Sequence, residues 1–328
     1  MASVGMLGTG TWGMALSRLL SLSGHDVICW SAIPSELMEL SETRRQKNLP
    51  DMEIPAEITF TPNIQSACAG RDLIVFAVPS PYVRSTAKAA APYIAPGTVI
   101  TDVAKGLEAG TLLTLSEVIS SEIPGIPVVA LSGPTHAEEV ARDLPSTIVA
   151  ACADERAAAF VQSVFMTPAF RVYTNTDIKG VELCGALKNI IALAAGISDG
   201  LGFGDNTRAA LITRGLAEME RLGACLGCRQ ETFAGLAGMG DLIVTATSRH
   251  SRNHTFGFLI GQGVAPADAM TRVGMVVEGV NALPGALTLS DKYGVEMPIA
   301  RAVEEVLHHG QSPADAVTAL MTRDRRGE

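Results

Sequence analysis

The chain has 328 residues, of which 47% are hydrophobic, which is enough material for two folded domains. Its net charge is −9, and no basic tract offsets this negative charge, so general nucleic-acid binding is not expected. We expect no secretory signal, because residues 1–6 lack a basic start and a cleavage site, and no uninterrupted apolar run reaches the roughly 18 residues that a membrane span needs. The six cysteines are scattered through mostly apolar segments, as in a reducing compartment, so we expect a cytoplasmic protein.

A glycine-rich turn follows the first apolar segment, residues 2–7. It runs Gly8-Thr-Gly10-Thr-Trp-Gly13, and helix-forming residues come next. The first glycine permits a tight turn, the second lets a pyrophosphate approach the backbone, and the third lets the helix pack on the strand. A merely structural turn is the alternative. A second strand pattern at residues 25–30 favours a dinucleotide site.

The residues at the end of that second strand do not decide whether the cofactor is NADH or NADPH. An NAD-type site usually has an acid here for the ribose hydroxyls. This chain has Ser31, followed by Ala32, and no arginine is adjacent to grip a 2′-phosphate. The basic patch at residues 44–47 lies further on and could reach such a phosphate. The alternative is that this patch is a solvated surface.

Strand and helix patterns alternate through the first half, which predicts a doubly wound, parallel α/β sheet of Rossmann type. The further strands are expected at 72–78, 98–101, 128–131, 146–150 and 170–173, with a helix at 82–91. Ligands of such sheets bind beyond the carboxyl ends of the strands. That rule selects the loops at 78–80, 102–106 and 132–135.

Two of these loops carry candidate binding groups. Lys105 follows a strand end, where a nicotinamide is expected, although it could be an ordinary surface lysine. Gly133 and Thr135 precede a helix expected from His136, with Thr135 as its cap. Free amides there can bind an anion or a carbonyl oxygen, and plain capping is the alternative.

After Asn175 the periodicity becomes helical, which divides the chain into a dinucleotide-binding domain, residues 1–176, and an all-α domain, residues 177–328. Helices are expected at 207–222, for about ten residues from Thr255, and as two amphipathic helices between 297 and 325. Cys225 and Cys228 have redox or zinc spacing but stand alone, so no metal site is expected.

One helix, residues 181–197, is apolar around most of its circumference and therefore predicted to be buried. It carries a single ammonium, Lys188, beside Asn189. Burial lowers the pKa of a lysine, which suits it to hold or release a proton. Asp241, among glycines and apolar residues, is its expected partner. The alternatives are that Lys188 extends its charged end to the protein edge or pairs with a nearby carboxylate such as Glu182, and that Asp241 caps a helix.

A cluster of donors, Ser251-Arg252-Asn253, stands before a helix pattern and is suited to a phosphate monoester. Ordinary capping with surface charge is the alternative. Further on, Glu278 precedes another helix and could be a cap residue.

Several stretches together resemble the bacterial-type NAD(P)-dependent glycerol-3-phosphate dehydrogenase family, in the family's order from residue 4 to about 310. They are 8–15, 104–108, 131–135, 182–189, 200–206, 211–218, 233–241 and 251–253. The glycine motif is generic, whereas the segments around Lys188, Asp241 and Ser251 are more specific.

The resemblance implies reversible reduction of dihydroxyacetone phosphate to sn-glycerol 3-phosphate for glycerophospholipid synthesis, with Lys188 as proton donor and acceptor and Asp241 beside it. It implies that the substrate is held by Lys105, Gly133, Thr135, Lys188, Asp241, Ser251, Arg252 and Asn253. Together with the glycine motif, it places the cofactor on Gly8, Gly10, Thr11, Trp12, Gly13, Lys105, Ala137, Arg252, Val276 and Glu278.

Three positions depart from the family pattern. A basic residue is common where Ser31 and Ala32 stand, an aromatic residue where Asn48 stands, and a phenylalanine where His136 stands. Two other functions stay open: a dehydrogenase of another small hydroxy acid, and a non-catalytic nucleotide sensor. We expect a homodimer, the most frequent oligomer of soluble proteins.

Overall fold

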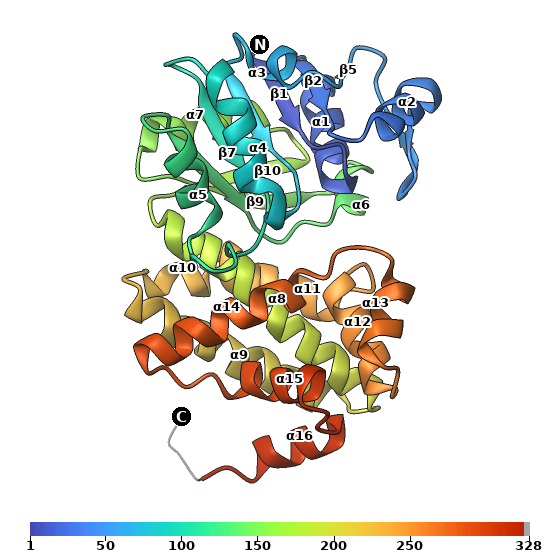
Figure 1. Ribbon diagram of the computed structural model, residues 1–328, viewed down its shortest axis with the longest axis vertical. Coiled ribbons are helices and arrows are strands. Elements are labelled where there is room, and N and C mark those ends of the chain that lie inside the picture. The colour runs from blue at the N-terminus through green and yellow to red at the C-terminus, as the bar shows by residue number, and fades with distance from the viewer. Residues whose placement is uncertain (325–328) are drawn as a thin grey trace. The chain divides into compact units, whose positions relative to one another are not determined.

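The computed structural model describes residues 1–324 (Figure 1). Contacts divide the chain into two compact units. The first holds residues 1–108 and 113–182, and the second holds residues 109–112 and the chain from Leu183 onward. The division falls inside helix α8 (Ile178–Gly200), whereas the change of sequence pattern predicts a boundary between residues 176 and 177, just before this helix.

An eight-stranded sheet forms the centre of the first unit, in the order β10-β9-β8-β7-β6-β1-β2-β5. The strands are β1 (Ser3–Leu7), β2 (Asp26–Trp30), β5 (Thr59–Thr61), β6 (Leu73–Phe76), β7 (Val99–Asp102), β8 (Val128–Ser132), β9 (Ser146–Ala151) and β10 (Phe170–Asn175). The chain winds outward from β1 to one side and from β6 to the other. The topological switch point, where nucleotides bind in such sheets, therefore lies between β1 and β6.

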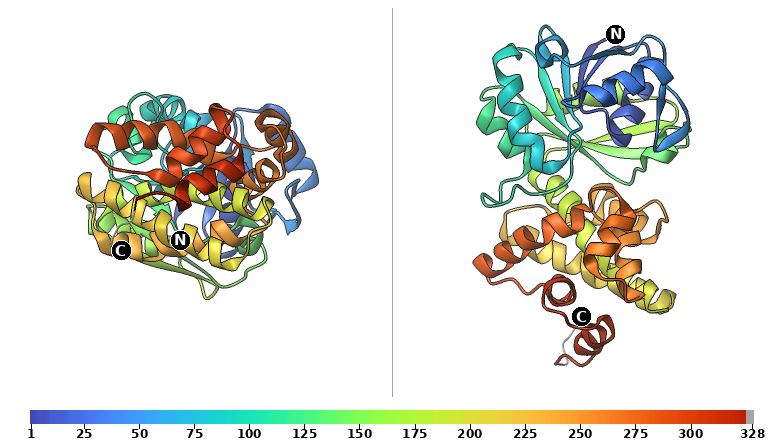
Figure 2. Two further views of the ribbon diagram at one scale, coloured as in Figure 1. Left: turned by 90° about the horizontal axis from the view of Figure 1, so that it is seen from below. Right: turned by 45° about the vertical axis from the view of Figure 1, so that its right-hand side comes forward.

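Helices cover both faces of this sheet (Figure 2), so the predicted doubly wound α/β class is confirmed. One hydrophobic cluster joins the sheet to α1 (Thr11–Leu22), α6 (Ala137–Val140) and α7 (Glu155–Phe165). The other joins it to α3 (Ile64–Cys68), α4 (Val83–Ala90) and α5 (Leu115–Glu122). The helix predicted at 82–91 is α4, which follows a 3-10 turn, η1 (Ser80–Tyr82). A second such turn, η2 (Ala91–Tyr93), follows it.

The sheet departs from the prediction in one respect, because β9 pairs with β8 in the antiparallel sense. β10 is parallel to β9, so both run against the other strands. The connection from β8 to β9 contains only the short helix α6, whereas a parallel crossover usually needs a full helix across one face. The sequence also did not predict the three-residue β5 or the short hairpin of β3 (Arg45–Gln46) and β4 (Leu49–Glu53), which follow α2 (Pro34–Thr43).

The second unit is helical, and its described residues contain no strand, as the sequence predicts. Its helices after α8 are α9 (Asp205–Cys225), α10 (Gln230–Ala234), α11 (Asp241–Thr247), α12 (Arg252–Gly261), α13 (Pro266–Val273), α14 (Glu278–Tyr293), α15 (Pro298–His308) and α16 (Pro313–Met321), with a π-helical turn, η3 (Leu236–Gly240). The last two are the expected amphipathic pair, although residue 325, their predicted end, lies outside the described residues. α12 begins three residues before the predicted Thr255, because Ser251 caps it.

Every residue of α8 from 181 to 198 is buried. Within the described residues, this helix alone is long and apolar enough to cross a membrane, with a mean hydropathy of 1.5, and its most apolar window is wholly buried in the protein. The prediction of a buried helix is therefore confirmed.

Glycines bring α8 and α12 into backbone contact. A Cβ on Gly257 would lie 2.1 Å from the Leu193 carbonyl oxygen, and one on Gly196 would lie 2.1 Å from the His254 carbonyl oxygen. Gly200 and Gly261 repeat the arrangement one turn further on. Side chains at these positions would force the helices apart, so the glycines set the distance between α12 and the helix that carries Lys188.

Candidate active site

The glycine loop of the first unit fits a pyrophosphate. Gly8 has a φ of +121°, and a Cβ on it would lie 2.6 Å from the Ala77 carbonyl oxygen. A Cβ on Gly13 would lie 2.3 Å from the Gly8 carbonyl oxygen, so the helix start packs against the loop. No atom lies within 4 Å of the Cβ position of Gly10, the residue before α1, and no side chain caps this helix. The backbone is therefore open to a phosphate at the positive end of α1, where Thr11 and Trp12 form the first turn.

The basic patch at residues 44–47 is committed largely to its own loop. One Arg44 nitrogen donates to the carbonyl oxygens of Ile58 (2.8 Å) and Pro55 (3.3 Å). Arg45 donates to the Pro50 carbonyl oxygen at 2.9 Å. These bonds favour a structural role for both arginines over a grip on a cofactor phosphate.

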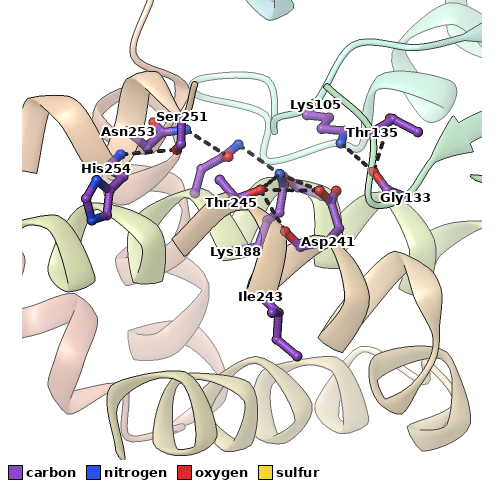
Figure 3. Close-up of polar contacts among 12 residues, drawn as sticks. Lys105, Gly133, Thr135, Lys188, Asp241, Ile243, Thr245, Ser251, Asn253 and His254 are labelled. Carbon is purple, nitrogen blue, oxygen red and sulfur yellow. Dashed lines mark hydrogen bonds and ion pairs between the residues drawn. The ribbon is translucent and has the colours of Figure 1, made fainter. Parts of the chain in front are cut away.

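Three predicted binding residues of the first unit meet on the loops after β7 and β8 (Figure 3). The Lys105 Nζ donates to the Gly133 carbonyl oxygen at 3.3 Å, and the Thr135 hydroxyl donates to the same oxygen at 3.3 Å. The cap predicted at Thr135 is wrong. α6 begins at Ala137, its N-cap is His136, and the His136 side chain makes no capping hydrogen bond. Because Thr135 turns back to Gly133, its hydroxyl is not directed at the helix.

A buried carboxyl at the end of β7, Asp102, has no role in the sequence-based prediction. It is 2% exposed, and its Oδ1 accepts a hydrogen bond from the Ala104 amide at 3.2 Å. Its Oδ2 has no hydrogen-bond partner among the described residues. Burial, and secondly the charge of Glu182, raise the pKa of Asp102 well above its usual range. Asp102 therefore holds the turn that leads to Lys105. Its raised pKa favours the protonated, neutral form of the Asp102 carboxyl.

Glu182, the alternative partner of Lys188, is engaged elsewhere. Its carboxylate accepts hydrogen bonds from the amide (2.7 Å) and the hydroxyl (2.5 Å) of Ser116. Burial raises the pKa of Glu182, and the two Ser116 bonds oppose that shift. Glu182 thus anchors the start of α8 to α5.

Lys188 pairs with Asp241, as predicted (Figure 3). The Nζ lies 2.7 Å from the Asp241 Oδ1, and the two residues are 4% and 1% exposed. A second hydrogen bond joins the Nζ to the hydroxyl oxygen of Thr245. Asp241 is the first residue of α11 and has helical backbone angles, and the N-cap of this helix is Gly240, so the capping alternative is wrong.

Thr245 is the partner that sequence reasoning missed. It lies one helical turn after Asp241, and its hydroxyl donates to the Asp241 carbonyl oxygen at 2.7 Å. The Thr245 oxygen is therefore turned to accept from the Lys188 ammonium. The spacing of four residues on one helix was the available signal, but a helical threonine more often bonds only to its own backbone.

The Ser251-Arg252-Asn253 segment opens α12 in the second unit. The Ser251 hydroxyl oxygen caps the helix by accepting from the His254 amide at 3.2 Å. The Asn253 side chain donates to the Asn189 Oδ1 at 2.9 Å and accepts from the Gly279 amide at 2.8 Å. Asn253 therefore joins α12 to α8 and α14, Ser251 caps α12, and the Arg252 side chain is exposed.

The remaining predicted contacts lie at helix starts. Ala137 begins α6 and is half-buried. Val276 is 38% exposed, two residues before Glu278, which begins α14 and accepts from the Asn281 side chain at 3.4 Å. Among the described residues no group of three or more His, Cys, Asp or Glu could hold a metal ion. Neither Cys225 nor Cys228 forms a disulfide bond within the described residues.

Comparisons with known proteins cover nearly the whole chain. Family models described as the N-terminus and the C-terminus of NAD-dependent glycerol-3-phosphate dehydrogenase match residues 3–158 and 177–318. A relative from Lactobacillus delbrueckii subsp. bulgaricus, named glycerol-3-phosphate dehydrogenase (NAD(P)+) 2, is 60% identical, and the match covers 100% of this chain and 99% of the relative. A relative of the same activity name from Agathobacter rectalis is 50% identical over 100% of this chain and 98% of its own.

A solved structure agrees. The crystal structure of glycerol-3-phosphate dehydrogenase from Coxiella burnetii has a TM-score of 0.94 and 37% identity, and the match covers 98% of this chain and 99% of that one. The two family models between them span most of the chain, in the order that the sequence motifs predict. This chain belongs to the NAD-dependent glycerol-3-phosphate dehydrogenase family.

Proposed function

We propose that this chain is a glycerol-3-phosphate dehydrogenase that reversibly reduces dihydroxyacetone phosphate to sn-glycerol 3-phosphate with NADH or NADPH, and that it serves glycerophospholipid synthesis. The observation that carries the proposal is the buried pair of Lys188 and Asp241 in a chain of this family. A nucleotide sensor needs no such proton donor, which speaks against a purely binding role.

A nicotinamide cofactor, when bound, would supply the hydride. The protein must then neutralise the charge that develops on the ketone oxygen, and the Lys188 ammonium does this by donating a proton to that oxygen. In the reverse direction the neutral Lys188 amine accepts the hydroxyl proton. Asp241 and Thr245 restrict the orientation of the Nζ, so the ammonium needs little reorganisation at the moment of transfer.

The proposed substrate contacts of each unit are polar groups. The exposed guanidinium of Arg252 is permanently charged and can bind a phosphate with two hydrogen bonds. Ser251 and Asn253 hold the start of α12, which carries Arg252. Lys105, Gly133 and Thr135 are the proposed substrate contacts of the first unit. On the cofactor side we propose Gly8, Gly10, Thr11, Trp12 and Gly13 at the glycine loop, with Lys105, Ala137, Arg252, Val276 and Glu278. A cytoplasmic homodimer is the proposed state of the enzyme.

The test is a substrate comparison on the purified protein. Oxidation of NADH and NADPH is followed with dihydroxyacetone phosphate, with unphosphorylated dihydroxyacetone, and with small 2-oxo acids. We expect turnover with the phosphorylated ketone and far less with the other compounds. Turnover of a 2-oxo acid, with none of dihydroxyacetone phosphate, would show a hydroxy-acid dehydrogenase instead.

A further inference from the structure

A carboxylate lies close to the end of β2, although it belongs to the following helix, α2, and not to the strand. Glu36 is in the first turn of α2, and its Oε2 accepts hydrogen bonds from the Ser31 hydroxyl at 2.8 Å and the Thr9 hydroxyl at 2.7 Å. In NAD-type sites the acid that binds the ribose hydroxyls comes about 20 residues after the glycine loop. Glu36 fits that interval, and its two donors belong to the glycine loop and to the residue after β2.

The two hydroxyls fix the carboxylate in place. Thr9 is 1% exposed and Ser31 is 6% exposed, so neither donor is free to turn to solvent. The Ser31 oxygen also accepts from the Ile33 amide at 3.2 Å, which sets the turn from β2 into α2. Both hydroxyls bond to the Oε2, and among the described residues no donor bonds to the Oε1. One oxygen is thus held by the protein while the other can accept from a ligand hydroxyl.

The surrounding charge disfavours a 2′-phosphate. A phosphate monoester carries about 1.5–2 negative charges at neutral pH and would meet the Glu36 carboxylate. The nearest basic side chains in the sequence, Arg44 and Arg45, donate to backbone carbonyl oxygens of their own loop. Lys47 is exposed beyond them.

We propose that Glu36 is the specificity-determining residue for the cofactor, that it binds the adenosine ribose hydroxyls, and that it makes the protein select NADH over NADPH. Ser31 and Thr9 are positioning residues that hold the carboxylate. The inference rests on the proposed dinucleotide site of the first unit and requires nothing of the substrate chemistry.

The test is binding of NADH and NADPH, each alone, followed by protein fluorescence or calorimetry without substrate. We expect the parent to bind NADH at least about tenfold more tightly than NADPH, and Glu36→Gln to lower this ratio by about tenfold, mainly through tighter NADPH binding. Ser31→Ala removes one of the two donors and should lower the ratio by less. Glu39→Gln, on an exposed position of the same helix, should leave the ratio unchanged.

Equal affinities of the parent for the two dinucleotides, an unchanged ratio in Glu36→Gln, or an equal change in Glu39→Gln would each overturn the inference. Binding of neither dinucleotide would overturn it as well. The expected ratios in a protein that fails to reduce dihydroxyacetone phosphate would support the inference and refute the proposed activity.

Discussion

Replacing Asp241 by asparagine should destabilise the second unit strongly, because it leaves the Lys188 ammonium buried without its counter-charge. The pair is almost fully excluded from solvent, with side-chain exposures of 5% and 1%. Removing one partner of a buried pair costs about 3–5 kcal/mol. Thr245 still accepts one hydrogen bond from the amine but carries no charge, so it compensates little.

The cost should also depend on pH in a defined direction. Without the carboxylate, burial lowers the pKa of Lys188 in the folded variant, while the unfolded chain keeps an ordinary lysine pKa of about 10.4. The folded variant then binds fewer protons than the unfolded chain, so its free energy of unfolding rises with pH until both forms are neutral.

Urea unfolding of the parent and of Asp241→Asn at pH 7 and at pH 9.5 measures both effects. The matched control is Asp291→Asn, which breaks the exposed pair with Arg301 and should cost at most about 1 kcal/mol. The double variant Lys188→Met with Asp241→Asn should recover much of the loss, because no buried charge remains. A cost for Asp241→Asn no larger than the control, or a cost that grows with pH, would refute the reasoning.

Three further changes test the structure away from the reacting groups. Asp102→Asn should raise the free energy of unfolding at pH 7 and not at pH 3. Burial raises the pKa of Asp102, so above the ordinary pKa of an aspartate the parent must bind a proton at this carboxyl when it folds. No gain at pH 7 would contradict this. Burial raises the pKa of Glu218 from 4.5 to about 7, so stability should fall between these pH values, and Glu218→Gln should flatten the fall by up to about 3 kcal/mol; an equally steep fall would contradict this. Gly257→Ala should cost about 1–3 kcal/mol by separating α8 from α12, while Thr255→Ala on the exposed side of α12 should cost little; equal costs in urea unfolding would argue against the contact.

The features that could be predicted from the sequence are those whose physical signal is local. Apolar runs between turn residues give the strands before and after Gly8, because a buried parallel strand is apolar on both faces. The pair of Lys188 and Asp241 could be predicted because each is a lone charge in an apolar segment, and such charges need partners.

The features that were missed depend on tertiary contacts. The reversed direction of β9 follows from the connection through α6, and no side-chain pattern records it. Gly257 weakens a helix pattern, and only the adjacent backbone of α8 explains it. Glu36 lies five residues after the strand end where an acid was sought, and the fold of α2 brings it back to Ser31.

The central claim is that the buried amine of Lys188 transfers the proton, and Lys188→Ala tests it most directly. Single-turnover reduction of dihydroxyacetone phosphate and the dissociation constant of the reduced cofactor are measured on the same folded preparation. We predict that the rate falls by about two to four orders of magnitude, the usual contribution of a general acid, while the dissociation constant of the cofactor stays nearly unchanged. A variant that keeps a rate close to that of the parent would contradict the account.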